Sequence, residues 1–261
     1  MKVGACVPLA HYEELVRCGY ASITLAGRDL AAWSEAELAH ARQVLEGGPL
    51  ERISLNSFCP GTLRLHGPGY SREAVRDFSR TVLERGALLG FRYLGVGAPA
   101  SRNLLPGEDE AEAMAQFREA IGDICDLAAE SGMEILLESV CTVECNFLTT
   151  TREALDFVRS MGRSNLHLVY DIYHEFMERQ PLSVIAEAGS EIRVVHVAQD
   201  VGQKRGYLDE REQPLFQRYW DALAAAGYDG EWSVEAFEGD TDEGLRRTMQ
   251  VMRSIQAAAS R

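Results

Sequence analysis

Residues 135–138 read ILLE, and three similar apolar runs follow: LHLVYD (166–171), VVHVA (194–198) and WSVEAF (232–237). Each run presents one side chain of a metal-binding type at or near its C-terminal end: Glu138, Asp171, His196 and Glu235. Successive members are 33, 25 and 39 residues apart, each about one strand-helix-strand unit. A buried carboxylate is costly unless a cation or another partner neutralises it. We therefore interpret these four side chains as one site, which the rest of the chain brings together.

Short apolar segments alternate with longer amphipathic ones along the whole chain. The apolar segments predict eight strands, at residues 3–9, 21–26, 51–59, 92–98, 133–139, 166–171, 192–198 and 231–237. The amphipathic segments predict helices over about 11–18, 34–45, 71–89, 109–131, 151–161, 175–188, 213–226 and 241–258. Eight such repeats in 261 residues predict an α/β fold, a single-domain (β/α)8 TIM barrel spanning residues 1–261. An open doubly wound sheet would need a Gly-rich turn after the first strand, where the sequence reads PLAHYEE.

Composition excludes several classes of function. A formal net charge of −14 argues against nucleic acid, which attracts basic surfaces, and it disfavours binding to an anionic membrane. No apolar run approaches the roughly 18 residues that a membrane span needs. The N-terminal stretch is interpreted as a strand and not a signal peptide, because His11 and two glutamates end it early. Six cysteines without a CxxC pair are typical of reduced thiols in a cytoplasmic protein.

Three carboxylates and one imidazole form an oxygen-rich ligand set. Such a set favours Mn²⁺ as the cofactor, with Mg²⁺, Co²⁺ and Zn²⁺ as alternatives, whereas a structural zinc site prefers Cys and His. Each residue also has a simpler interpretation: Glu138 as a rim ion pair, Asp171 as a helix cap and His196 as a core histidine. The occurrence of all four on successive strands favours the shared metal site. Cys141 and Cys145 lie close to Glu138 in the sequence and leave a second metal site open.

The chain resembles the xylose isomerase-like TIM-barrel superfamily, in its branch of sugar (phosphate) isomerases and epimerases. The resemblance covers essentially the whole chain and is most specific at LLESV (136–140), the D-x-x-H of Asp171 and His174, HVAQD (196–200) and GYDGEWSVEAF (227–237). It implies a divalent metal held by the four residues named above, with substrate contacts from Glu144 and His174. Ketose 3-epimerases of this family carry an Arg six residues after the metal-binding His. Here that position is Gly202, and the nearest basic residues are Lys204 and Arg205.

These features predict a divalent-metal-dependent isomerase or epimerase acting on a ketose or keto-polyol, by proton transfer through a metal-bound ene-diolate. Glu138 and Glu235 are the predicted catalytic carboxylates. They would lie on well-separated strands, which favours epimerisation over aldose–ketose isomerisation. Further candidates for substrate binding are Arg205, Arg102 and His66, because each lies in a loop expected at the active end of the barrel.

Two other functions share the same scaffold. A metal-dependent lyase or dehydratase acting on a keto-sugar would begin with the same proton abstraction, and a non-catalytic sugar-binding relative would bind without turnover. The DNA-repair endonuclease branch is disfavoured, because it needs extra His ligands and the fourth strand ends in GVGAPAS. We expect a small, free sugar as the partner, since no Gly-rich phosphate loop is present. Homodimer and homotetramer both remain open.

Overall fold

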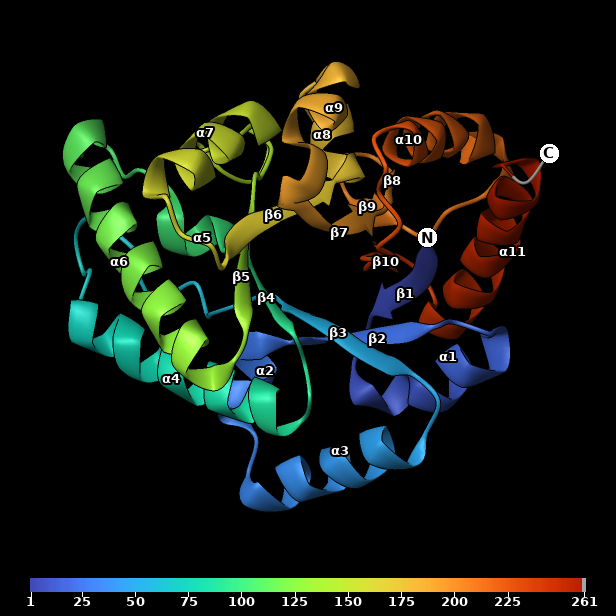
Figure 1. Cartoon of the computed structure of the whole chain (residues 1–261), viewed down its shortest axis with the longest axis horizontal. Coiled ribbons are helices and arrows are strands. Elements are labelled where there is room, and N and C mark those ends of the chain that lie inside the picture. Colours follow the sequence, from blue (N-terminus) through green and yellow to red (C-terminus); the bar gives the residue numbers. More distant parts are fainter. Residues whose placement is uncertain (260–261) are drawn as a thin grey trace.

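Eight parallel strands close into a barrel in the order β1-β10-β7-β6-β5-β4-β3-β2 (Figure 1). The computed structural model describes residues 1–259, so the predicted domain of residues 1–261 ends two residues beyond the described part. The strands are β1 Lys2–Cys6, β2 Ser22–Ala26, β3 Glu51–Asn56, β4 Tyr93–Val96, β5 Glu134–Glu138, β6 Leu166–Asp171, β7 Ile192–Val197 and β10 Glu231–Val234. The predicted (β/α)8 barrel is therefore confirmed.

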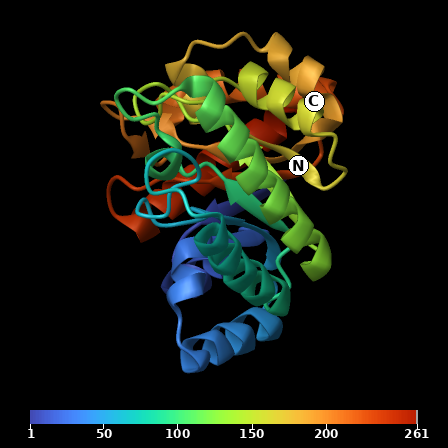
Figure 2. The ribbon, with the colours of Figure 1, turned by 90° about the vertical axis from the view of Figure 1, so that its left-hand side faces the viewer.

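Helices surround this ring (Figures 1 and 2). They are α1 Tyr12–Cys18, α2 Gly27–Ala32, α3 Glu35–Gly47, α4 Arg72–Leu88, α5 Pro99–Arg102, α6 Glu110–Ser131, α7 Thr151–Met161, α8 Ile172–Met177, α9 Ser183–Ala188, α10 Gln213–Ala225 and α11 Thr241–Ala259. Short 3₁₀ turns are η1 Leu9–His11, η2 Gly189–Glu191 and η3 Glu210–Glu212. Two very short strands, β8 Gln199–Asp200 and β9 Arg205–Gly206, form a separate antiparallel pair.

The predicted helix over residues 175–188 is wrong in its extent, because two helices occupy this region. α8 begins immediately after β6, where the Asp171 side chain accepts a hydrogen bond of 2.8 Å from the Tyr173 backbone nitrogen. It ends at Met177, and Arg179 has a φ of 52°. Pro181 follows two residues later and prevents the helix from continuing, so α9 starts separately.

The inside of the barrel contains an apolar layer and a polar layer. Tyr93, Leu136, Val169 and Val194 form the apolar layer, with alternate residues of each strand pointing inward. In the polar layer, Thr24 Oγ1 lies 3.1 Å from Ser54 Oγ and 3.2 Å from Ser233 Oγ. Ser233 Oγ lies in turn 3.3 Å from Cys6 Sγ. These buried polar groups therefore satisfy one another.

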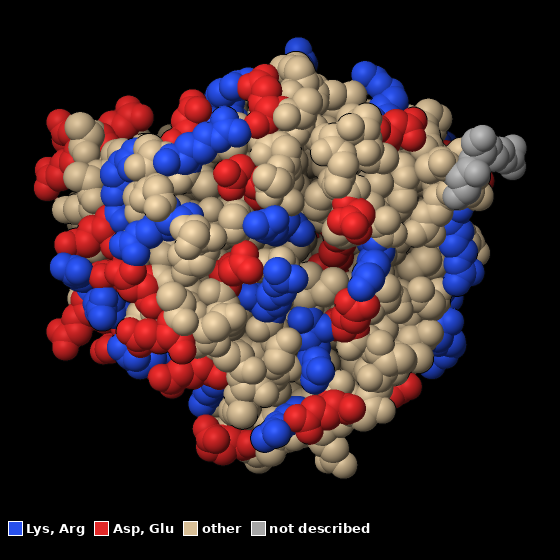
Figure 3. Space-filling view, in the orientation of Figure 1, with Lys and Arg blue, Asp and Glu red and all other residues tan. Residues whose placement is uncertain are grey.

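The outer surface carries charges of both signs. In the face shown in Figure 3, acidic and basic side chains are interspersed over the surrounding helices. Between α4 and α6, Asp123 accepts hydrogen bonds from Arg72 and Arg76, each with a closest distance of 2.6 Å. Within residues 1–259, no helix has the length and apolar character to cross a membrane.

Candidate metal centre and substrate cavity

Four buried side chains converge at the C-terminal end of the barrel: Glu138, Asp171, His196 and Glu235. Each offers one ligand atom, and these atoms all lie within 4.8 Å of one another. The first three come from β5, β6 and β7, where Asp171 and His196 are register partners, and Glu235 directly follows β10. The parallel strands thus deliver all four to the end of the barrel where active sites of this fold are found.

His196 lies between two of the carboxylates. Its Nδ1 is 3.0 Å from Glu138 Oε1 and 3.3 Å from Glu235 Oε2, and its side chain also contacts Cys6. Burial lowers the pKa of His196, but the negative charge of Glu235 and Glu138 outweighs burial and raises it overall. Nδ1 is therefore the nitrogen that faces the carboxylate cluster.

A glycine makes room for Glu138. A Cβ added to Gly97, just after β4, would lie 2.4 Å from Glu138 Oε2, closer than two such atoms can approach. Only a residue without a side chain therefore allows the Glu138 carboxylate to take its observed position.

Arg205, on β9, supplies positive charge to the cluster. Its Nη2 donates hydrogen bonds to Asp171 Oδ2 and Glu235 Oε2, and its guanidinium lies 4.9 Å from the centre of the Tyr173 ring. Burial lowers the pKa of Arg205, but the surrounding carboxylates outweigh burial and raise it. For the carboxyl group of Glu235, burial raises the pKa, but the positive charges of Arg205 and His196 outweigh burial and lower the pKa overall. Glu235 is therefore ionised at neutral pH.

A cavity of about 230 Å³ opens beside the four converging residues. Its walls include Glu138, Glu144, His174, Arg205, Glu235 and Phe237, and residues 97–101 form another side. The volume suits one small ligand. Both predicted catalytic carboxylates and three of the five predicted substrate-binding residues thus lie around one cavity.

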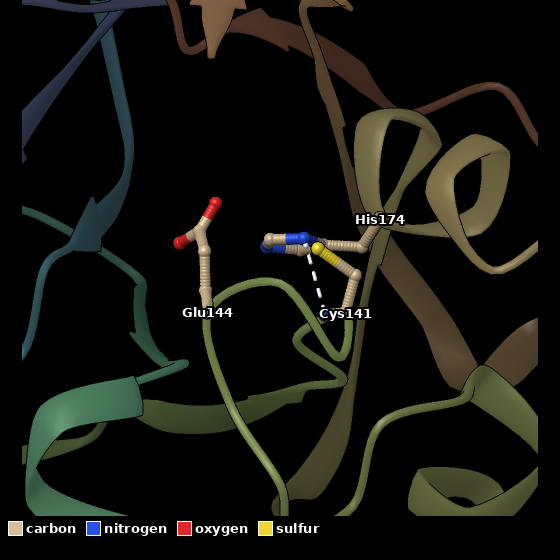
Figure 4. Close-up of side chains that lie close together, drawn as sticks. All are labelled: Cys141, Glu144 and His174. Atoms are coloured by element: carbon tan, nitrogen blue, oxygen red, sulfur yellow. Dashed lines mark hydrogen bonds between the residues drawn. The ribbon is translucent and has the colours of Figure 1, made fainter. Parts of the chain in front are cut away.

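His174 and Glu144 come from different elements, α8 and the loop after β5, and Figure 4 shows them with Cys141. His174 Nδ1 accepts a hydrogen bond of 3.3 Å from the Cys141 backbone nitrogen, and Arg205 Nη1 lies 3.5 Å from His174 Nε2. Burial lowers the pKa of His174 to about 3, and the ring is neutral at physiological pH. The neutral His174 ring therefore lies between a backbone N–H donor and the Arg205 guanidinium.

Cys141, Glu144 and His174 also have ligand atoms within 4.8 Å of one another, so Cys141, but not Cys145, belongs to a second group that could hold an ion. Two observations disfavour it. His174 Nδ1 is already used as an acceptor, and Glu144 is exposed, so water can solvate its carboxylate without an ion. The arrangement favours hydrogen bonding over metal binding.

Arg102 and His66 do not line the cavity, contrary to their expected role as substrate contacts. Arg102 is fully buried, and its Nη2 donates to the backbone oxygens of Glu138 at 2.9 Å and Leu148 at 3.4 Å. His66 is also fully buried, with its Nε2 2.6 Å from the Arg102 oxygen. Both side chains turn back into the protein, where each donates to or contacts a backbone oxygen.

The sequence reasoning missed Asn56 and Cys6. Asn56 Nδ2 donates to Glu235 Oε1, and Cys6 contacts His196. Both end their strands, β3 and β1, at the same end of the barrel as the four predicted ligands. Asn56 could have been found by the criterion used for Asp171, a polar residue at the end of an apolar run. Cys6 carried no such signal, because a cysteine fits an apolar strand.

Comparisons with known proteins agree with this fold. The family described as xylose isomerase-like TIM barrel matches residues 12–255. A ketose 3-epimerase of Arthrobacter globiformis is 31% identical over 56% of this chain and 50% of its own length. An L-ribulose 3-epimerase of Methylomonas sp. (strain DH-1) is 32% identical over 64% of this chain and 56% of its own length. The chain thus spans about half the length of the curated relatives it matches.

Similarity to solved structures extends over nearly the whole chain. D-psicose 3-epimerase from Clostridium cellulolyticum H10, solved with D-tagatose, superposes with a TM-score of 0.85 at 18% identity. The match covers 98% of this chain and 99% of that one. At this identity the likeness establishes the fold alone.

Proposed function

We propose that this chain, which belongs to the xylose isomerase-like TIM-barrel family, is a divalent-metal-dependent sugar epimerase or isomerase that acts on a ketose or keto-polyol. The observation that carries the proposal is the convergence of Glu138, Asp171, His196 and Glu235 beside a cavity that Glu144, His174 and Arg205 also line. The curated relatives named epimerases support it, although they match only part of their length.

The donor set fits a hard divalent ion. Three carboxylates and one imidazole, all buried with ligand atoms within 4.8 Å of one another, favour Mn²⁺, with Mg²⁺, Co²⁺ or Zn²⁺ as alternatives. Glu138, Asp171, His196 and Glu235 would hold it. When bound, such an ion polarises a carbonyl group and acidifies the neighbouring C–H bond.

Proton transfer falls to Glu138 and Glu235. Both carboxylates line the cavity, and they come from strands that β6 and β7 separate in the barrel. Two carboxylates on different sides of one carbon can remove its proton from one face and return a proton to the other. This arrangement favours epimerisation over isomerisation, which needs only one of them.

The remaining polar residues bind and orient the sugar. His174 contacts a substrate hydroxyl group through its ring, Glu144 accepts a hydrogen bond from a hydroxyl group, and Arg205 donates to a substrate oxygen. A cavity of about 230 Å³ suits a single free sugar. We further propose a cytoplasmic enzyme that acts as a homodimer or homotetramer.

The deciding experiment is incubation with Mn²⁺ and a panel of ketoses and keto-polyols in deuterated water. An epimerase inverts one carbon next to the carbonyl and introduces deuterium there, which NMR detects. Loss of water or of an aglycone would instead identify a lyase. Binding of a sugar without any deuterium incorporation would leave a non-catalytic binding protein, and either result would refute the proposal.

A further inference from the structure

The segment from Ala98 to Leu104, which includes α5, contacts the site in two ways. Its first residues, Ala98 to Ser101, form part of the cavity wall. Its last residues, Arg102 to Leu104, bind the loop between β5 and α7. We call this loop, residues 139–150, the Glu144 loop, because it carries that cavity-lining carboxylate.

Arg102 holds the base of the Glu144 loop. Its Nη2 donates to the Glu138 oxygen, where the loop leaves β5, and to the Leu148 oxygen near the other end. The Val140 backbone nitrogen also donates to the Leu148 oxygen, at 3.4 Å. Arg102 is fully buried, and its Nε and Nη1 have no hydrogen-bond partner among the described residues. A buried guanidinium without a carboxylate partner is costly, so packing alone does not account for it.

Asn103 and Asn146 join the tip of the loop to the segment through four hydrogen bonds. The Asn146 backbone nitrogen donates to Asn103 Oδ1 at 2.8 Å, and Asn103 Nδ2 donates to the Glu144 backbone oxygen at 3.3 Å. In return, the Leu104 backbone nitrogen donates to Asn146 Oδ1 at 2.8 Å, and Asn146 Nδ2 donates to the Leu104 oxygen at 3.0 Å. Asn103 therefore fixes the backbone at Glu144 and two residues beyond it.

The Glu144 carboxylate itself has no hydrogen bond to any described residue. Its direction therefore depends on how firmly its backbone is held. In Figure 4 the side chain rises from the loop on the side opposite Cys141, next to His174. A backbone that could shift would carry the carboxylate away from this position.

We propose that Asn103 is a positioning residue that holds the Glu144 carboxylate in place for substrate, with Arg102 fixing the base of the same loop. The inference rests on the proposed function, in which Glu144 contacts the sugar. Asn103 does not line the cavity and acts only through the loop. Misplacing one substrate-binding group by about 1 Å can lower turnover on the order of 100-fold.

The kinetic test compares Asn103→Ala with Asn165→Ala. Asn165 also donates one side-chain hydrogen bond to a backbone oxygen, that of Cys125 at 2.7 Å, but it precedes β6 at the opposite end of the barrel. We expect N103A to lower kcat/KM about 10- to 100-fold and N165A to leave it unchanged. N103D keeps the acceptor for Asn146 and loses the donor to Glu144, so it should fall between N103A and the unsubstituted chain. Equal kcat/KM in N103A and the unsubstituted chain would overturn the proposal.

A double-mutant cycle tests whether the effect passes through Glu144. If it does, N103A alone lowers kcat/KM, but adding N103A to the Glu144→Gln variant has no further effect. Losses that multiply in the double variant would show that Asn103 acts elsewhere, and the proposal would fail. Manganese affinity should be the same in N103A and the unsubstituted chain.

Hydrogen exchange tests the positioning without needing turnover. We expect peptides covering residues 139–150 to exchange faster in N103A than in N165A, with the rest of the barrel unchanged. Unchanged exchange in this loop would refute the positioning role. If the unsubstituted chain turned over no ketose, the proposed function would fail, while the exchange measurement would still decide what Asn103 does.

Discussion

Glu138 and Glu235 belong to one cluster, but their oxygens are used differently. Glu235 accepts from Asn56 at Oε1 and from Arg205 at Oε2, so both of its oxygens are occupied. Glu138 Oε1 lies beside His196, whereas Oε2 rests against Gly97 and has no hydrogen bond to a described residue. For the proposed proton transfer, Glu138 therefore has the freer oxygen, and its position depends on the glycine.

We predict that Gly97→Ala lowers kcat by about 10- to 100-fold with little loss of stability. The new Cβ would meet Glu138 Oε2, which is the end of a flexible side chain and can move aside. The carboxylate would be displaced, but the barrel would not. Steady-state kinetics and urea unfolding measure the two effects separately. Gly47→Ala is the control, because a Cβ there meets nothing within 4 Å. Normal turnover in G97A would contradict the prediction.

Glu231 is a buried carboxyl group outside the cluster, placed at the start of β10 and away from the cavity. Burial raises its pKa from the ordinary 4.5 to about 7, and the hydrogen bond from Ser22 only partly opposes this. The native protein therefore holds a proton here between pH 4.5 and 7 that the unfolded chain has released. The resulting stability is fully present below about pH 4.5 and is lost as the pH rises through about 7.

We predict that Glu231→Gln removes this pH dependence. Gln stays neutral at every pH, so the variant should match the unsubstituted chain near pH 4.5 and exceed its stability above pH 8. The difference should be on the order of 3 kcal/mol, the equivalent of a shift of about 2.5 pKa units. Urea unfolding at pH 5 and 8.5 measures it, with Glu46→Gln, at an exposed carboxylate paired with Arg42, as the control. If E231Q and the unsubstituted chain lost the same stability from pH 5 to 8.5, Glu231 would not be the source of the pH dependence.

Among the secondary-structure elements, length decides what could be predicted from the sequence. α6 has 22 residues and α11 has 19, so each shows several repeats of its buried face, and both were predicted almost to their ends. α2 with six residues, α5 with four and the β8–β9 pair with two residues in each strand show no periodicity and were missed. Such short elements depend on tertiary contacts.

Two of these unpredicted elements determine the detail of the site. β8 and β9 fold back on each other through a turn in which Gly202 has a φ of 72°, a left-handed conformation that suits glycine. This return brings Arg205, nine positions after His196, into contact with Asp171 and Glu235. α5 likewise directs the Arg102 side chain into the protein interior. The sequence predicted a loop here, with Arg102 contacting the substrate. The ligand set follows from strand ends, but the direction of loop side chains does not.

At the scale of the whole barrel, the proposed ion would be shared by four neighbouring strands. β5, β6, β7 and β10 are consecutive in the ring, and each contributes one of the four converging side chains at or directly after its end. The remaining half of the ring supplies Asn56, Cys6 and part of the cavity wall. An ion held in this way binds the folded barrel only, because the unfolded chain separates its ligands. Metal binding and global stability are therefore linked.

We predict that Mn²⁺ added after chelation with EDTA raises the melting temperature. At 100 times the dissociation constant, binding to the native state alone contributes about 2.7 kcal/mol, or roughly 5–10 °C for a chain of this size. Asp171→Asn should abolish the increase, although Asn can still accept the hydrogen bond from Tyr173 that starts α8. Glu238→Gln, at an exposed carboxylate paired with Lys204, should retain it. Scanning calorimetry with and without the ion measures the melting temperature of each variant. An equal increase in D171N and in the unsubstituted chain would mean that the ion binds elsewhere, because Asp171 is one of the four candidate ligands in this cluster.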